Sequence, residues 1–102
     1  MSVTMAISYN FEWDPVKARE NRDKHAVTFD EAASVFKDSK ALSKFDSEHS
    51  ETEDRWLTLG ISERGRLLVL IHTFQEDSKE AVTIRIISCR KATKHESKIY
   101  GE

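Results

Sequence analysis

The sequence predicts an α+β domain: a meandering, mainly antiparallel sheet with two N-terminal helices and a short C-terminal helix packed on one side. Two helix starts stand in the first third of the chain, and strand-like segments follow one another between residues 55 and 89. A further helix start lies close to the C-terminus. The order β-α-α-β-β-β-β-α is typical of this class. Because 102 residues is an ordinary size for one domain, we expect residues 1–102 to form a single domain.

The first strand and the first helix meet at Asp14-Pro15. Apolar and polar residues alternate from Ile7 to Trp13, which is the period of a half-buried strand. Asp14 can accept hydrogen bonds from the free amides of a new helix, and Pro15 suits its first position because proline has no amide to leave unpaired. We therefore expect a helix from Pro15 to about His25.

This first helix has almost no apolar face, so it needs another means of attachment. Four polar residues share one side of it at the spacing i, i+4, i+7 and i+8, namely Lys17, Asn21, Lys24 and His25. The spacing alone does not decide whether this side faces a ligand or the solvent.

The second helix carries a clear start signal and a core-facing stripe. Thr28 and Glu31 have the spacing of a reciprocal capping box, and Val27 with Ala32 is placed as its hydrophobic staple. The apolar stripe has helical spacing and consists of Phe29, Ala32, Ala33 and Phe36. We expect this helix to be structural.

The remaining elements follow from alternation and turn residues. A short edge strand is expected at residues 41–45, and Glu63-Arg64-Gly65 is a hairpin turn between two longer strands. The longer predicted strands are Arg55–Ser62, Arg66–Phe74 and Ala81–Cys89. Thr93 and Glu96 form a second capping box, which opens a helix that runs to Tyr100.

Composition restricts the class of protein. No apolar run is long enough to span a membrane, and the first residues lack the pattern of a signal peptide, so we expect a cytoplasmic protein without a membrane contact. Cys89 is the single cysteine, which leaves no internal disulfide and no cysteine zinc site. The net charge of −2 conceals a division: residues 1–54 sum to −5, and residues 55–102 to +3. Such a division suits two partners, a polyanion and a basic protein, or simply two solvated faces.

Arg85 is the most unusual residue, because it interrupts an apolar strand. An arginine there must extend to solvent, line a cleft, or pair with an acid such as Glu12 or Glu53, because burial without a partner is very costly. Arg90 lies five positions further on, so it falls on the opposite face unless the strand bends or bulges.

The histidines show no metal-ligand spacing, and we expect neither a metal nor an organic cofactor. We expect His72 to be a satisfied core residue and His49 to be solvated. His25 and His95 are candidates for proton transfer. Cys89 is expected to be a small buried residue, with its basic neighbours as the one argument for reactivity.

Several ordered blocks of the sequence resemble one family of bacterial toxins. These blocks are FEWDPVKARENRDKHAVTFDEA, EDRWLTLG, GRLLVLIHT and RIISCRKATKHESKIY. Together they resemble the BrnT toxins of type II toxin–antitoxin modules, from about Phe11 to Tyr100. The positions that correspond are Trp13, Asp14, Lys17, Asn21, Lys24, His25, Arg55, Arg66, Arg85, Arg90, Glu96 and Tyr100. The stretch Glu76–Glu80 is extra and lengthens a hairpin.

The resemblance implies a RelE-like fold and a ribonuclease that halts translation. It also implies neutralisation by a BrnA-like antitoxin with a ribbon-helix-helix domain, in a 2:2 assembly that contacts operator DNA through the antitoxin alone.

A metal-free cleavage of RNA agrees with the residues present. The 2′-hydroxyl attacks the neighbouring phosphate, and the protein supplies a base, an acid and cations. Our hypothesis is that Arg85 and Arg90 bind the scissile phosphate, and that Lys24 and His25 transfer protons or add a phosphate contact. The expected RNA-binding residues are Lys17, Arg66, Lys94 and Tyr100, the last as a stacking platform or as a pin for its helix. The alternative is a non-catalytic module that binds RNA or protein through the basic C-terminal patch.

Overall fold

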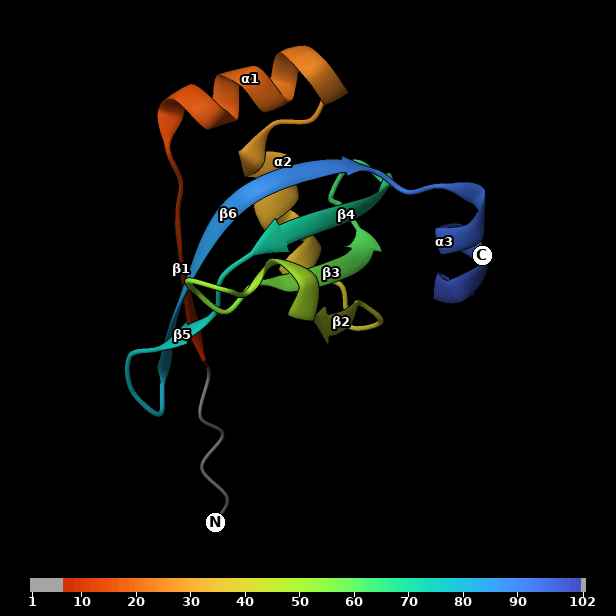
Figure 1. Ribbon diagram of the computed structural model, residues 1–102. Helices are drawn as coiled ribbons and strands as arrows, with labels where there is room; N and C mark the ends of the chain where they lie inside the picture. Colours follow the sequence, from red (N-terminus) through yellow and green to blue (C-terminus); the bar gives the residue numbers. More distant parts are fainter. Residues whose placement is uncertain (1–6, 102) are drawn as a thin grey trace.

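A six-stranded mixed sheet forms the frame of the protein, and the computed structural model describes residues 7–101 of it (Figure 1). The strand order is β1-β6-β4-β3-β2, and β5 pairs with β6 beside this path. The strands are β1 Ser8–Glu12, β2 Leu42–Phe45, β3 Trp56–Ile61, β4 Leu67–His72, β5 Gln75–Glu76 and β6 Ala81–Lys91.

The antiparallel meander is confirmed for most of the sheet. β2, β3, β4 and β6 pair antiparallel, in chain order, and the turn at residues 63–65 joins β3 to β4. Gly65 takes a positive φ of 77° in that turn, which glycine adopts without strain. β1 differs because it pairs parallel to β6. A short turn imposes antiparallel pairing, whereas the long connection from β1 to β6 imposes no direction.

Within residues 7–101, three α-helices and two single turns of 3₁₀-helix complete the fold: α1 Pro15–His25, α2 Phe29–Ser34, η1 Val35–Lys37, η2 Ser47–His49 and α3 Lys94–Tyr100. The Asp14 carboxylate accepts from the Val16 amide at 2.8 Å, as predicted for the start of α1. The reciprocal capping box of α3 at Thr93 is confirmed. None of the helices within residues 7–101 has both the length and the apolar character needed to cross a bilayer.

The predicted capping box of α2 is half correct. The Thr28 hydroxyl accepts from the Glu31 amide at 3.1 Å. The Glu31 carboxylate does not return to Thr28 but accepts from Arg66 Nε at 2.8 Å and from Ser62 Oγ at 2.7 Å. A guanidinium offers a charged, two-pronged donor, which is a stronger partner than a neutral backbone amide.

The core lies between α2 and one face of the sheet. Val27, Phe29, Ala32 and Val35 are almost completely buried there. Phe29 and Ala32 belong to the predicted stripe, and its other two members, Ala33 and Phe36, are partly buried against the same cluster. The sheet contributes Leu68, Leu70, Val82, Ile84, Ile86 and Cys89 to the same cluster. The other face of the sheet has no α-helix lying across it (Figure 1).

The three helices do not share one side in the way we predicted. α2 lies behind the sheet in the view of Figure 1, α1 runs along β6, and α3 stands at the far end of β6. The reason is composition: α1 has too few apolar residues to cover a sheet face.

Asn21 is what fastens α1 to β6. Its side chain is buried, donates to the carbonyls of Val27 at 3.1 Å and Cys89 at 2.9 Å, and accepts from the Cys89 amide at 3.0 Å. One amide side chain therefore bridges the helix, the loop after it and the central strand. Of the four polar residues on that side of α1, Asn21 has a structural role.

We predict that Asn21→Ala lowers the free energy of unfolding by about 3 kcal/mol, because it leaves buried backbone groups of Val27 and Cys89 without partners. Chemical denaturation measures the change. Lys24 is an exposed residue on the same helix, so Lys24→Ala is the control. Its free energy of unfolding should change by no more than about 0.5 kcal/mol. Equal midpoints for the two variants would contradict the bridging role.

Candidate functional site

A bulge in β6 brings Arg85 and Arg90 to the same face of the sheet. Ile86 and Cys89 are both 1% exposed and belong to one core, although they lie three positions apart. The pairing with β4 shifts between Ile71 and His72, where β6 has one residue more than its partner. An extra residue reverses the alternation beyond it. Both arginines therefore lie on the face away from α2.

Arg85 lines a pocket of about 550 Å³ between β6, the start of α1 and the loop before β3. Lys17 and Asp14 form the α1 side of this pocket, and Thr52 with Glu53 forms the loop side. The Arg85 guanidinium donates to the Glu53 carboxylate, so the ion pair that we considered for Arg85 is present, with Glu53 as the partner.

Glu53 is held by two arginines. Arg55 donates to its second oxygen at 3.4 Å, and the hydrogen bond from Arg85 lowers the pKa of the Glu53 carboxyl below its ordinary value. Glu53 is therefore an anion at neutral pH, and it occupies the guanidinium that we predicted to bind a phosphate.

Arg90 is paired in the same manner at the other end of the site. Its two terminal nitrogens donate to the two oxygens of Glu96 at 2.7 and 2.9 Å. This bidentate pair lowers the pKa of Glu96 to about 2. Arg90 also lines a groove of about 390 Å³, whose apolar lining residues include Leu57, Leu59, Val69 and Ile99.

We predicted that Arg85 and Arg90 bind the scissile phosphate together, and the distance between them tests how they can do so. Five residues of extended strand span roughly 16 Å, and both side chains are held by different carboxylates. This geometry favours contact with different phosphates of one RNA strand over a grip on the same phosphate.

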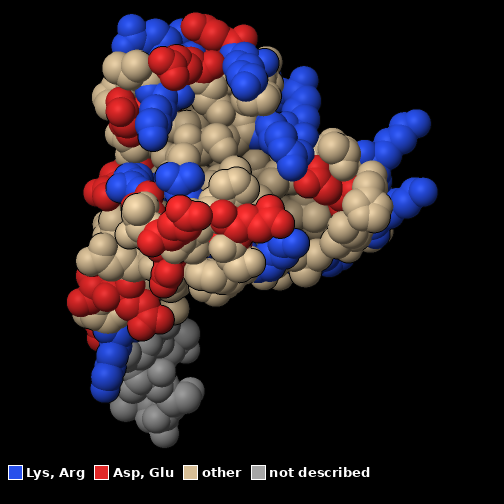
Figure 2. Space-filling model, viewed as in Figure 1, with Lys and Arg blue, Asp and Glu red and all other residues tan. Residues whose placement is uncertain are grey.

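Acidic and basic side chains are distributed unevenly over this face (Figure 2). Acidic side chains cross the middle, where the segment between β2 and β3 runs in front of the sheet. Basic and acidic side chains are mixed over α1 above them, and basic side chains project around α3 beside them. The acidic residues of that segment are Asp46, Glu48, Glu51, Glu53 and Asp54. The basic groups thus flank an acidic segment and do not form one continuous patch.

The three predicted site residues of α1 lie at different distances from Arg85. Lys17 shares the pocket of Arg85. Lys24 lies two turns further along the same side of the helix and is exposed, and His25 is half-buried at the end of α1. Because Asn21 between them points to Cys89, this side of α1 follows β6 from Arg85 toward Arg90 (Figure 1).

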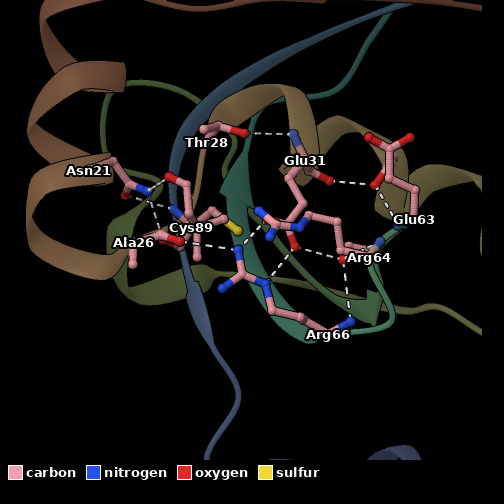
Figure 3. Close-up of polar contacts among 11 residues, drawn as sticks. Asn21, Ala26, Thr28, Glu31, Glu63, Arg64, Arg66 and Cys89 are labelled. Atoms are coloured by element: carbon pink, nitrogen blue, oxygen red, sulfur yellow. Dashed lines mark hydrogen bonds and ion pairs between the residues drawn. The ribbon is translucent and has the colours of Figure 1, made fainter.

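Arg66 has a structural role that the sequence did not reveal (Figure 3). It donates to both oxygens of the Glu31 carboxylate and to the Ala26 carbonyl. The hydrogen bond from Arg66 lowers the pKa of Glu31. Arg66 also lines a pocket of about 470 Å³ with Lys91 and Lys94, so its phosphate contact and that of Lys94 stay predictions for this pocket.

Three predictions concern Cys89 and two of the histidines. Cys89 is 1% exposed, and burial raises the pKa of its thiol to about 12, so the thiol is inert despite its basic neighbours. His72 is also buried, with both ring nitrogens hydrogen-bonded, as expected for a satisfied core histidine. His49 is exposed but bonded to Asp46 at 2.9 Å.

Tyr100 pins α3 to the rest of the protein. Its hydroxyl donates to the Asp38 carboxylate, which also accepts from the Ile61 amide at 2.9 Å. The structure therefore gives Tyr100 the second of its two predicted roles, and stacking on a base stays a prediction.

The sequence pointed to the cations but largely missed their partners. Glu96 was identified as a helix cap alone, although it also binds Arg90. Glu53 was one of two candidates for Arg85. The signal that was present is the run of acidic residues at 46–54, which contains Glu53. Among residues 7–101 there is no group of three His, Cys, Asp or Glu side chains placed to hold a metal.

Comparison with protein families identifies the chain. The family model described as "Ribonuclease toxin, BrnT, of type II toxin-antitoxin system" matches residues 13–96. The chain belongs to the BrnT family. No curated protein matches the chain significantly.

The crystal structure of the Brucella abortus ribonuclease toxin BrnT is similar to this BrnT-family chain with a TM-score of 0.50 and 24% identity. The match covers 89% of this chain and 100% of the Brucella chain. At this identity the likeness supports the α+β fold alone.

Proposed function

We propose that this toxin is a metal-independent endoribonuclease of RelE-like fold, which acts in the cytoplasm and inhibits translation by cutting RNA. The observation that carries the proposal is the pocket of about 550 Å³ on the open side of the sheet, whose lining contains both Arg85 and Lys17. Two cations at fixed positions suit a phosphate whose negative charge grows in the transition state.

The proposed reaction uses the ribose of the substrate as its nucleophile. The 2′-oxygen forms a bond to phosphorus, the bond to the 5′-oxygen breaks, and one proton moves from the 2′-hydroxyl to the leaving 5′-oxygen through the protein. Arg85 and Lys17 stabilise the phosphorane. Lys24 and His25 lie about two turns beyond Lys17 on the same side of α1, so we assign them the second of their two predicted roles, a further phosphate contact.

The neighbouring nucleotides follow β6 in this proposal. Arg90 contacts an adjacent phosphate, and the pocket of Arg66 and Lys94 takes one further along. The ring of Tyr100 supplies a stacking surface on α3. A BrnA-like ribbon-helix-helix antitoxin neutralises the toxin, with two copies of each chain in the complex, and contacts operator DNA on behalf of both.

RNA must compete with carboxylates for these arginines. Glu53 and Glu96 occupy Arg85 and Arg90 in the absence of substrate. A phosphodiester that enters the site replaces Glu53 on Arg85 and displaces the acidic segment from the middle of the face. The lowered pKa of Glu53 makes this carboxylate a weak base, so we assign it competition with RNA and no proton transfer.

We predict that Arg85→Ala lowers cleavage of purified RNA in EDTA by about 100-fold or more, as expected for loss of a cation that stabilises transition-state charge. The variant should also relieve growth arrest and still bind the antitoxin. Arg64→Ala, which removes the same charge from an exposed hairpin tip, is the control and should cleave normally. A folded Arg85→Ala protein that remains toxic refutes the assignment.

A wild-type protein that shifts RNA in a salt-sensitive manner without fragments supports the non-catalytic module instead.

We predict that Glu53→Gln strengthens RNA binding and raises cleavage at low substrate concentration, each by about 3- to 10-fold, because it removes the anion that competes for Arg85. Filter binding and initial rates measure the two effects. Glu51→Gln removes an equal charge from the same exposed segment and is the control, with a smaller gain. A loss of cleavage in Glu53→Gln would show that Glu53 assists the reaction and would overturn this part of the mechanism.

A further inference from the structure

An aromatic pocket lies on the opposite side of the sheet from Arg85. It measures about 440 Å³ and is lined by Tyr9, Phe36, Ser43, Trp56, His72, Phe74 and Glu76. Tyr9 pairs in register with the buried residue Val82, so it projects from the face that carries α2. The pocket is therefore separate from the proposed cleavage site and shares no residue with its lining.

Two aromatic residues of this pocket, Tyr9 and Phe74, are open to solvent, whereas Phe36 and Trp56 are half-buried. Tyr9 is 45% and Phe74 42% exposed, and the Tyr9 ring centroid lies 6.1 Å from that of Phe36. Large exposed apolar side chains that gather at one place mark a binding surface more often than a core. The volume is in the range of pockets that hold a side chain or a small ligand.

Two polar side chains of the lining, His72 and Ser43, already have hydrogen-bond partners outside the pocket. His72 Nε2 lies 2.6 Å from the Thr58 hydroxyl, which lies 2.8 Å from the Ser43 hydroxyl. The His72 Nδ1 lies 2.9 Å from the Thr73 carbonyl, and burial lowers the pKa of the ring, so it is neutral at pH 7.

Glu76 supplies the one carboxylate among the residues that line the pocket, in addition to the hydroxyl of Tyr9 and the indole N–H of Trp56. It lies on β5, beside a loop in which Asp77 and Glu80 outnumber Lys79 (Figure 1). Rings with negative faces and a nearby carboxylate attract a cation and repel a phosphate. Charge and ring chemistry together select a lysine or arginine side chain over a nucleotide.

We propose that this pocket docks a lysine or arginine side chain of the antitoxin, flanked by apolar residues that cover Tyr9 and Phe74. The proposal rests on the antitoxin partner of the proposed function and not on the cleavage chemistry. The antitoxin then holds the toxin on the face that RNA does not use, and a second segment remains available to cover Arg85.

The first test uses a small probe with the intact toxin. N-acetyl-arginine methylamide should shift the NMR signals of Trp56 and Phe74 in a saturable manner, and the neutral norleucine analogue should bind more weakly. Phe74→Ala and Glu76→Gln should each weaken the arginine probe by about 3- to 30-fold. Glu80→Gln, in the same loop but outside the lining of the pocket, is the matched control and should leave binding unchanged.

The second test measures the toxin–antitoxin complex. Phe74→Ala and Glu76→Gln should weaken the antitoxin by a similar factor and leave RNA cleavage by the free toxin unchanged. Equal binding of the norleucine analogue, preferential binding of adenosine monophosphate, or shifts that depend on toxin concentration without a probe would each overturn the proposal. The last two would identify a nucleotide or a second copy of this chain as the occupant. A wild-type toxin that binds the arginine probe but cuts no RNA would refute the proposed function and leave this inference standing.

Discussion

The one-residue bulge in β6 is the constraint on which the arrangement of the site depends. Without it, Cys89 and Arg90 would exchange faces, and the core would receive a guanidinium where it now has a buried thiol. The bulge places Arg90 with Arg85 on the open face, and it keeps Cys89 against the core. The Asn21 side chain bonds both the carbonyl and the amide of Cys89. These bonds align α1, which carries Lys17, with β6, which carries both arginines.

Electrostatics explains how a chain with a net charge of −2 can still bind RNA. Each of the three arginines at issue, Arg66, Arg85 and Arg90, is held by a glutamate, and these pairs differ in their strength. Glu31 is buried against Arg66 and Glu96 is bidentate with Arg90, whereas Glu53 comes from a loop and is a third exposed. In our account Arg85 is the cation whose carboxylate is easiest to exchange for a phosphate. Such an exchange would be sensitive to salt, because counter-ions compete for the same guanidinium.

Much of the fold could be predicted, because it rests on local chemistry. Asp14-Pro15 determines the start of α1, Thr93 with Glu96 that of α3, and alternation identifies the central strands. Parallel pairing of β1 could not be predicted, since it depends on residues far apart in sequence. The bulge could not be predicted either, because no turn residue marks its position in the sequence. Nor could the glutamate partners of most of the arginines be predicted. Glu31 illustrates the limit: its spacing from Thr28 predicted a cap, but a distant arginine is the stronger partner.

The central claim is that fixed cations on the open face allow the ribose of RNA to cleave its own phosphodiester. The most direct measurement is to map both ends of RNA that the purified protein has cut in EDTA. The account predicts 5′-hydroxyl ends and 2′,3′-cyclic phosphate ends. Fragments with 5′-phosphate and 3′-hydroxyl ends, or cleavage that requires added magnesium, would contradict it.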